Sequence, residues 1–210
     1  MYRVLLALAL ACSMASCGTS RSVVASLNGD AHNPYKVGTK STPAQNTPAP
    51  VQTASTDKAP KGVWEKAPKG VLSDRNYELT RLEPETARDL VNEYRKKHGL
   101  KPLQLNTQLT LAAKEHSRDL AKWDRISHYG SDGSNPWDRV KRTGYNPRVT
   151  AENVGTGQAS FDEVLKGWRD SAGHNKNLLL ADATQMGIAL VQDPKTEFKT
   201  FWTLVLGSPK

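Results

Sequence analysis

Histidine and carboxylate side chains occur in three short segments that also hold glycine or small residues. These segments are ISHYG (126–130), TAENVG (150–155) and SAGHN (171–175). Neutral imidazole nitrogens and carboxylate oxygens are ligands that suit Zn²⁺. His128 and His174 lie 46 residues apart, however, and the sequence has no compact H-x-x-x-H pair. By spacing alone, two interpretations stay open, a metal or catalytic site that includes Glu152 and a set of structural hydrogen bonds.

A further histidine, His116, falls on the apolar face of a predicted helix. This placement favours a hydrogen-bonded core histidine over a ligand. Ser117 and Ser171 each stand near a histidine in the sequence. No orienting acid or oxyanion hole is indicated beside either serine, so we do not predict serine catalysis.

The elements that must position these residues follow from apolar spacing and capping residues. Pro84 suits a first helical position, and apolar residues recur at helical spacing until His98-Gly99. A second helix is capped by Asn106. Its predicted inward face consists of Leu109, Ala112, Ala113, His116, Leu120 and Trp123.

The rest of the predicted domain mixes helices with strands. We expect a short helix from Pro136 that stops at Gly144, a brief strand over Val149–Val154, and a helix that a Ser160–Glu163 capping box begins. Two β-rich runs, 186–192 and 198–207, flank a turn and predict a hairpin. Helices around a small, mainly antiparallel sheet make an α+β layered sandwich.

The amino terminus is typical of an export signal. Arg3 precedes an apolar run that is too short to span a bilayer. The sequence MASC, ending at Cys17, resembles a bacterial lipobox, which implies a signal peptide over 1–16 and a lipidated Cys17 as the membrane attachment. Gly18 in place of Asp then implies the outer membrane or cell surface. Simple cleavage near Ala15 is the alternative and gives a periplasmic or secreted chain.

The segment that follows is rich in Ser, Thr, Pro, Ala and Lys and has no helical or alternating apolar period. We therefore expect residues 17–78 to form a disordered tether and residues 79–210 to form one domain. KAPKGV occurs twice, at Lys58–Val63 and Lys66–Val71. The repeat is either a local duplication in a linker or a basic docking strip anchored by Trp64.

Charge and cysteine content restrict the partners. The 210-residue chain has a formal net charge of +8, and from Arg81 onward 20 basic and 16 acidic residues leave +4. This spread-out excess favours anionic lipid headgroups or cell-wall polymers and does not favour nucleic acid. The two cysteines, Cys12 and Cys17, lie outside the predicted domain. A disulfide framework and a thiolate zinc cluster are thus excluded within the domain. We also expect the domain to be monomeric.

Seven motifs follow one another in a fixed order over about residues 84–208. They are HS (116–117), ISHYG (126–130), RVKRTGY (139–145), TAENVGTG (150–157), GWRDSAGHNKNLL (167–179), MGIALV (186–191) and FWTLVLG (201–207). In this order they resemble the bacterial branch of the CAP superfamily of cysteine-rich secretory, antigen 5 and pathogenesis-related 1 proteins, whose domain is also called SCP. The resemblance implies a three-layer α-β-α sandwich with a central cleft.

The same resemblance assigns residues to the cleft. His128 and His174 take the positions of two histidines that bind zinc in some relatives, and Glu152 takes the position of an acidic residue. Ser171 stands where eukaryotic relatives have a second acid, so the implied metal site is open and weak. Asn153 is expected in the cleft beside Glu152, where both residues can also brace it by hydrogen bonds.

Three functions stay open at this point. The leading one is a lipid-anchored cell-envelope binding module that accepts a lipid-like or other small ligand, because eukaryotic relatives bind sterols and other lipids. The second is a metal-dependent hydrolase of peptide or cell-wall material, with Glu152 as the general base. The third is a host-interaction or wall-tethering protein whose cleft is idle.

Overall fold

The structure is a computed structural model that describes residues 65–67, 69–70 and 72–210. The predicted signal peptide, Cys17 and the first KAPKGV copy lie outside these residues, and the second copy lies partly outside them. No helix in the described part of the chain is both long enough and apolar enough to cross a membrane.

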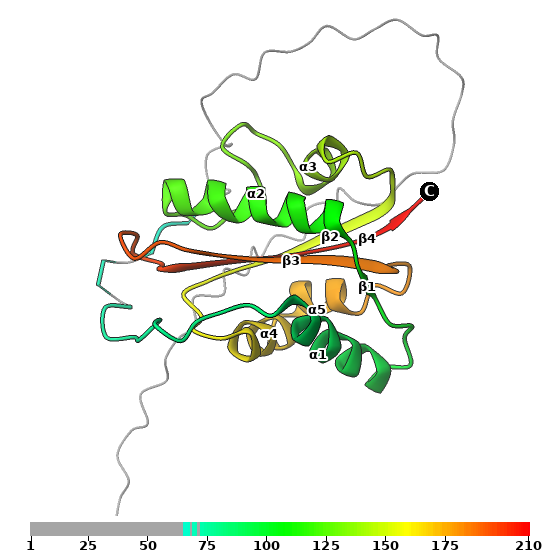
Figure 1. The fold of residues 1–210 in the computed structure, drawn as a ribbon, viewed down its shortest axis with the longest axis horizontal. Coiled ribbons are helices and arrows are strands. Elements are labelled where there is room, and N and C mark those ends of the chain that lie inside the picture. The colour runs from blue at the N-terminus through cyan, green and yellow to red at the C-terminus, as the bar shows by residue number, and fades with distance from the viewer. Residues whose placement is uncertain (1–64, 68, 71) are drawn as a thin grey trace, which may run out of the picture.

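The described residues form five helices and four strands in three layers (Figure 1). In chain order these are α1 (Pro84–Lys97), β1 (Gln104–Leu105), α2 (Thr107–Trp123), α3 (Pro136–Arg142), β2 (Pro147–Thr156), α4 (Phe161–Asp170), α5 (Ala172–Leu178), β3 (Gln185–Gln192) and β4 (Thr200–Pro209). Helices α2 and α3 cover one face of the sheet, and α1, α4 and α5 cover the other. The predicted three-layer α-β-α sandwich is therefore confirmed.

The sheet has the strand order β1-β3-β4-β2, so β2 is an edge strand. The short β1 pairs in parallel with β3, while β3 with β4 and β4 with β2 are antiparallel, which confirms the mainly antiparallel sheet. In the register of the β2–β4 pair, Glu152 lies opposite Val205 and Asn153 lies opposite Leu204. Because successive side chains point to opposite faces of a strand, Glu152 and Asn153 belong to different layers.

Alternation along β4 separates the hydrophobic core into two sides. Trp202, Leu204 and Leu206 pack in a cluster with residues of α1, α4 and α5. Val205, on the other face, packs with Leu109, Ala112 and Ala113 of α2 and with Val140 of α3. The sheet thus holds both helical layers by apolar contact, which is the main source of stability in such a domain.

The helix starts agree with the predicted capping residues, with one difference. The Asn106 side chain accepts a hydrogen bond from the Leu109 amide at 3.0 Å. The Ser160 side chain likewise accepts from the Glu163 amide at 3.2 Å. The Glu163 carboxylate, however, accepts from the Ala159 amide at 2.9 Å, so the predicted capping box is only half formed.

Trp123 does not lie on the inward face of α2 as predicted, because its side chain is 48% exposed. It is the last residue of the helix, and the chain turns at Asp124, which has a φ of 47°. The burial of α2 accordingly ends at Ala121. Lys122 extends its ammonium over the indole ring, 5.4 Å from the ring centroid.

The described residues between 65 and 82, which we call the N-terminal strap, lie against the rest of the domain. Glu65 forms an antiparallel bridge with Ile126, and Leu72 is 7% exposed within an apolar cluster. Residues 65–78 were predicted as disordered tether, so the packed chain begins before the predicted boundary at residue 79. Apolar side chains such as Leu72 supply the burial that offsets the ordering entropy of this segment.

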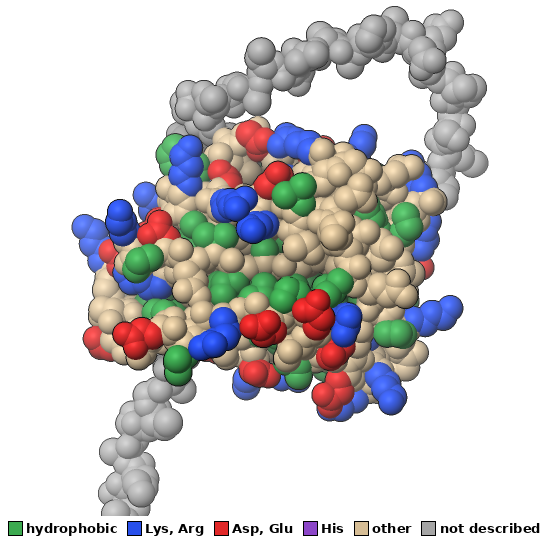
Figure 2. All heavy atoms as spheres, viewed as in Figure 1, with side chains coloured by type: hydrophobic (Ala, Val, Ile, Leu, Met, Phe, Trp, Pro, Cys, Tyr) green, Lys and Arg blue, Asp and Glu red, His purple; other side chains and the backbone are tan. Residues whose placement is uncertain are grey.

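Charged side chains of both signs are interspersed on the face shown in Figure 2, and no single-sign stripe runs across it. Hydrophobic side chains form a band across the middle of this face. On this face the charge pattern agrees with the spread-out basic excess of the sequence.

Candidate functional site

Glu152, on the edge strand β2, lies at the centre of a buried polar cluster. One carboxylate oxygen accepts a hydrogen bond from His128 Nδ1 at 3.0 Å, and the other accepts from Arg139 at 2.7 Å. His116 Nε2 is 3.6 Å from the first oxygen. The Glu152 side chain is 1% exposed, so its charge is compensated by these neighbours rather than by water.

Arg139 belongs to α3 and ties the loop that carries His128 to this cluster. Its guanidinium donates to the carbonyl oxygens of Ser134 at 2.8 Å and of His128 at 3.0 Å, in addition to the Glu152 carboxylate. Three hydrogen bonds from one planar cation thus fix both the carboxylate and the backbone beside the first histidine. No feature of the sequence marked Arg139 as a site residue.

His116, on α2, donates through Nε2 to the Ser127 carbonyl oxygen at 2.8 Å. Its Nδ1 has no hydrogen-bond partner among the described residues. Burial, reinforced by the Arg139 charge, lowers the pKa of His116 to about 4 although Glu152 opposes the shift. The prediction of a core histidine is confirmed. The neighbouring Ser117 hydroxyl donates to Thr203 at 2.8 Å and is thereby occupied structurally.

Glu152 remains an anion in this environment. Burial by itself raises its pKa, but the charges of Arg139 and His116 and the hydrogen bond from His128 hold the pKa well below its usual range. A charged carboxylate can only accept, so the His128 Nδ1 carries a proton, and Nε2 is the ring nitrogen that could bind a metal when the imidazole is neutral. The His128 side chain is 25% exposed, so this ring reaches solvent.

His174 approaches His128 from the other layer. It lies on α5, is 5% exposed, and its ring centroid is 6.4 Å from that of His128 with the planes at 57°. Burial, together with the charge of His128, lowers the pKa of His174 to about 4. The His174 imidazole is therefore neutral at pH 7, and its Nδ1 has no hydrogen-bond partner in the described part of the chain.

Amide side chains connect the two layers around β2. Asn153 donates to the His174 carbonyl oxygen at 3.1 Å. Asn177 donates to the Asn153 side chain and to the Glu152 carbonyl oxygen, both at 2.9 Å. These bonds satisfy an outward-facing carbonyl of the edge strand and fix α5 against it. The two histidines thus meet across the edge of β2.

The donor set fits a metal ion with few protein ligands. Zn–N bonds of about 2.0–2.1 Å at a tetrahedral angle would place two coordinated imidazole centroids about 5 Å apart. The observed separation is 6.4 Å, so the two rings would have to move closer to share one zinc ion. Among the residues that the structure describes, no group of three or more His, Cys, Asp or Glu side chains could hold a metal. His128 and His174 would bind a zinc ion that otherwise keeps water ligands, since the Glu152 oxygens already have partners.

The three predicted cleft residues differ in burial. Glu152 and Asn153 are buried, at 2% and 0% exposure, so they support the histidines from below and do not line an open cleft. Ser171 lies at the junction of α4 and α5, where its carbonyl oxygen accepts from the Asn175 amide at 2.8 Å. Because Glu152 and Asn153 point to opposite faces of β2 and both are buried, helices cover this strand on both sides.

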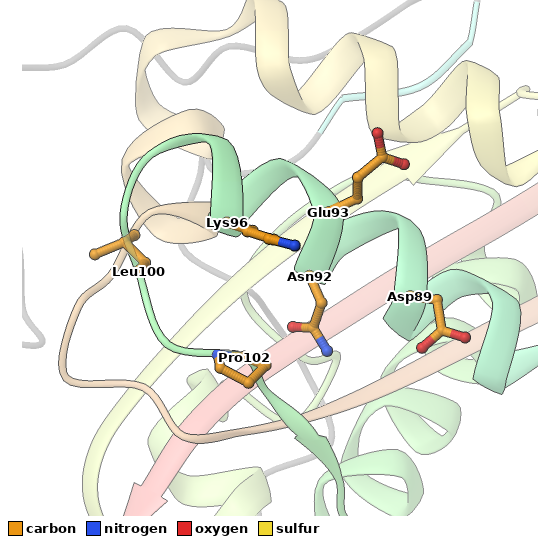
Figure 3. Close-up of a pocket in the computed structure, with 6 residues that line it drawn as sticks. All are labelled: Asp89, Asn92, Glu93, Lys96, Leu100 and Pro102. Carbon is orange, nitrogen blue, oxygen red and sulfur yellow. The ribbon is translucent and has the colours of Figure 1, made fainter.

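Two cavities lie away from the histidines. One, of about 330 Å³, lies between α1 and the segment after it (Figure 3) and is lined by Asp89, Asn92, Glu93, Lys96, Leu100 and Pro102. The other, of about 540 Å³, lies between the N-terminal strap and the β3–β4 connection. Both volumes fall within the range of small-molecule sites, about 300 to 1,000 Å³.

Solved structures of several bacterial proteins share this fold. The chain matches an outer surface protein of Borrelia burgdorferi with a TM-score of 0.54 and 23% identity, covering 60% of this chain and 92% of that one. It matches an extracellular SCP-domain protein of Bacillus anthracis with a TM-score of 0.52 and 25% identity, covering 60% and 44% of the respective chains.

Two Bacillus subtilis proteins are similar in sequence. The uncharacterized protein YkwD is 35% identical over 104 residues, which are 50% of this chain and 40% of YkwD. The uncharacterized membrane protein YlbC is 27% identical over 123 residues, 59% of this chain and 36% of YlbC. The chain therefore spans well under half the length of these relatives. Residues 88–206 match the profile of the family described as "CAP: Cysteine-rich secretory protein family", and the chain belongs to this family.

Proposed function

We propose that this protein is an exported binding module in which His128 and His174 hold a divalent metal ion, with zinc as the best fit. The hydrogen bond from His128 Nδ1 to the Glu152 carboxylate, at 3.0 Å, carries the proposal. It turns Nε2 of this partly exposed ring into the nitrogen that can ligate a metal, beside the neutral His174 imidazole. A carboxylate behind a ligating histidine is the usual way in which proteins fix a ligand's tautomer and orientation.

The binding function is favoured over the hydrolase because of the state of Glu152. A general base must reach a water molecule and release its proton later. Both Glu152 oxygens instead accept hydrogen bonds, from His128 and Arg139, and the side chain is 1% exposed. Glu152 therefore serves as a positioning residue for His128.

The open metal positions supply a place for an exogenous ligand. Two protein nitrogens leave coordination sites for oxygen donors such as the carboxylates of lipids or of cell-wall peptides. Attachment through a lipidated Cys17 would keep the domain at the cell envelope, where such ligands occur. The metal ion would then serve to bind the ligand, and no reaction is required.

A calorimetric zinc titration of the full chain tests the metal site. We expect one zinc ion per chain for the wild type and loss of that binding in the His128→Ala/His174→Ala double variant. His98→Ala is the matched control, because His98 lies at the end of α1, outside the site, and its Nδ1 contacts the Tyr94 carbonyl oxygen at 2.9 Å. Equal binding by the wild type and the double variant would contradict the proposal.

The ligand and the anchor need separate experiments. Extraction of the purified protein followed by mass spectrometry, with and without a zinc chelator, tests the ligand, and chelation should release it. A protein that carries no extractable molecule and exchanges no labelled fatty acid would count against a lipid-like ligand. Cys17→Ser should move the chain from the membrane fraction to the soluble fraction, and an unchanged distribution would exclude the lipid anchor.

A further inference from the structure

The N-terminal strap is attached to the domain at several points along its length. Its polar contacts are Gly70 N to Glu197 at 2.9 Å, Arg75 to Glu163 at 2.6 Å, the Tyr77 hydroxyl to the Gly157 carbonyl at 3.0 Å and the Thr80 hydroxyl to the Ala159 carbonyl at 2.8 Å. A segment held this way is part of the folded domain, although its composition resembles that of a linker.

Leu72 is the apolar anchor of the strap. It is 7% exposed and belongs to a cluster that includes Ile126, Phe198 and Phe201. A Cβ atom built on Gly157, which has a φ of +85°, would come within 2.6 Å of Leu72 Cδ1. The absence of a side chain at Gly157 therefore makes room for the leucine.

The first described residue of the strap pairs with the loop that carries His128. The Glu65 amide donates to the Ile126 carbonyl at 3.0 Å, and the Ile126 amide donates back at 2.9 Å. Ile126 is 2% exposed in the same cluster as Leu72, so the strap holds it through both backbone and side chain. Ile126 is only two residues before His128.

The remaining contacts of this loop come from other elements. Arg139 holds the carbonyl oxygen of His128, and the Asp119 carboxylate accepts from the Ser131 amide at 2.7 Å. The strap therefore secures one end of the loop, while α2, α3 and Glu152 of β2 hold the rest. Detaching the strap would release that end while leaving the sheet intact.

We propose that the strap is a latch that couples the chain preceding Glu65 to the position of His128. A force or a partner that acts on that preceding segment reaches the loop through the Glu65–Ile126 pair and the Leu72 anchor. The predicted membrane attachment at Cys17 lies on the same side of the strap in the sequence. This inference goes beyond the proposed function, since it concerns control of the loop and holds with or without a metal.

Amide hydrogen exchange measured by NMR on the metal-free full chain tests the latch. Leu72→Asp places a charge in the apolar cluster and should detach the strap. We expect exchange to accelerate by about tenfold or more at Glu65 and Ile126 and also at Tyr129, whose amide donates to the Ser127 hydroxyl at 2.9 Å. Leu79→Asp is the matched control within the strap, because Leu79 is 78% exposed.

Amides of the β2–β4 ladder, such as Thr203, report whether the variant keeps its fold. If they lose protection in Leu72→Asp, the milder Leu72→Ala takes its place with the same expected pattern. Faster exchange at Glu65 and Ile126 with unchanged Tyr129 would overturn the coupling. An effect of Leu79→Asp equal to that of Leu72→Asp, or unchanged exchange at all three amides, would overturn the role of the Leu72 anchor.

Discussion

Replacing Glu152 by glutamine removes one acceptor from the buried cluster while keeping the size of the side chain. The carboxylate accepts from His128 with one oxygen and from Arg139 with the other. Glutamine has one oxygen and one NH₂ group, so one of the two partners must face a donor. If the NH₂ faces His128, the ring has to move its proton from Nδ1 to Nε2. If it faces Arg139, two donors meet, and in either orientation the buried guanidinium loses its counter-charge.

The cost follows from the burial of the pair. Arg139 and Glu152 are 6% and 1% exposed, and removing one partner of a buried ion pair costs about 3–5 kcal/mol. Total stabilities of natural domains are about 5–15 kcal/mol, so the variant folds with a much reduced margin. With a urea m-value of about 1–3 kcal/mol/M, the midpoint should fall by roughly 1 to 5 M.

Urea unfolding at pH 7 measures this loss, and Glu163→Gln is the matched control. Glu163 pairs with Arg75, but the two side chains are 30% and 27% exposed, so its replacement should cost about 1 kcal/mol or less. Long-range ¹H–¹⁵N NMR of the His128 ring reports the tautomer. A Glu152→Gln variant that unfolds like the wild type and keeps the proton on Nδ1 would refute the positioning role of Glu152.

Two further predictions concern stability. The folded-state pKa values of His116 and His174 are lowered to about 4, so the unfolded chain binds more protons than the folded chain below pH 6.5. As the pH falls from 6.5 to 4, each histidine should lower the free energy of unfolding by about 3 kcal/mol. His174→Gln should therefore remove roughly half of the histidine-dependent loss of unfolding free energy, measured by urea titrations of the metal-free protein between pH 6.5 and 4. An unaltered pH dependence would contradict the lowered pKa of His174. Gly187→Ala should destabilise by about 3 kcal/mol or more, because its Cβ would lie 2.1 Å from the Thr110 nitrogen of α2. Gly173→Ala, which meets nothing within 4 Å, is the control, and equal unfolding midpoints for the two would refute the close packing of β3 on α2.

Much of the fold was predictable because local signals and tertiary contacts agree. The helix that starts at Pro84 and the hairpin strands appear where apolar periodicity placed them. Helix α5 was not predicted, since Ala172–Leu178 has no apolar period. Hydrogen bonds from other parts of the chain hold it instead, such as that from Tyr94 to Asn175 at 2.8 Å. Contacts between residues distant in sequence leave no local pattern, which also explains why the packing of the N-terminal strap was missed.

In the candidate site, too, some residues were recognisable from the sequence and others depend on long-range packing. His128, Glu152 and His174 were identified through the family resemblance, and the structure brings them together around the edge of β2. Arg139 could not be recognised as the partner of Glu152, because a basic residue late in a short helix is usually a solvated one. Its orientation toward β2 depends on how α3 packs on the sheet. Asn177 was missed for the same reason.

The metal site itself is tested most directly by a crystal structure of the protein soaked with zinc and recorded at the zinc absorption edge. We predict one anomalous peak about 2.0–2.1 Å from His128 Nε2 and from a nitrogen of His174, with Glu152 still bound to His128 Nδ1. Crystals that show no peak between the two rings, or a zinc ion held by the Glu152 carboxylate, would contradict the account.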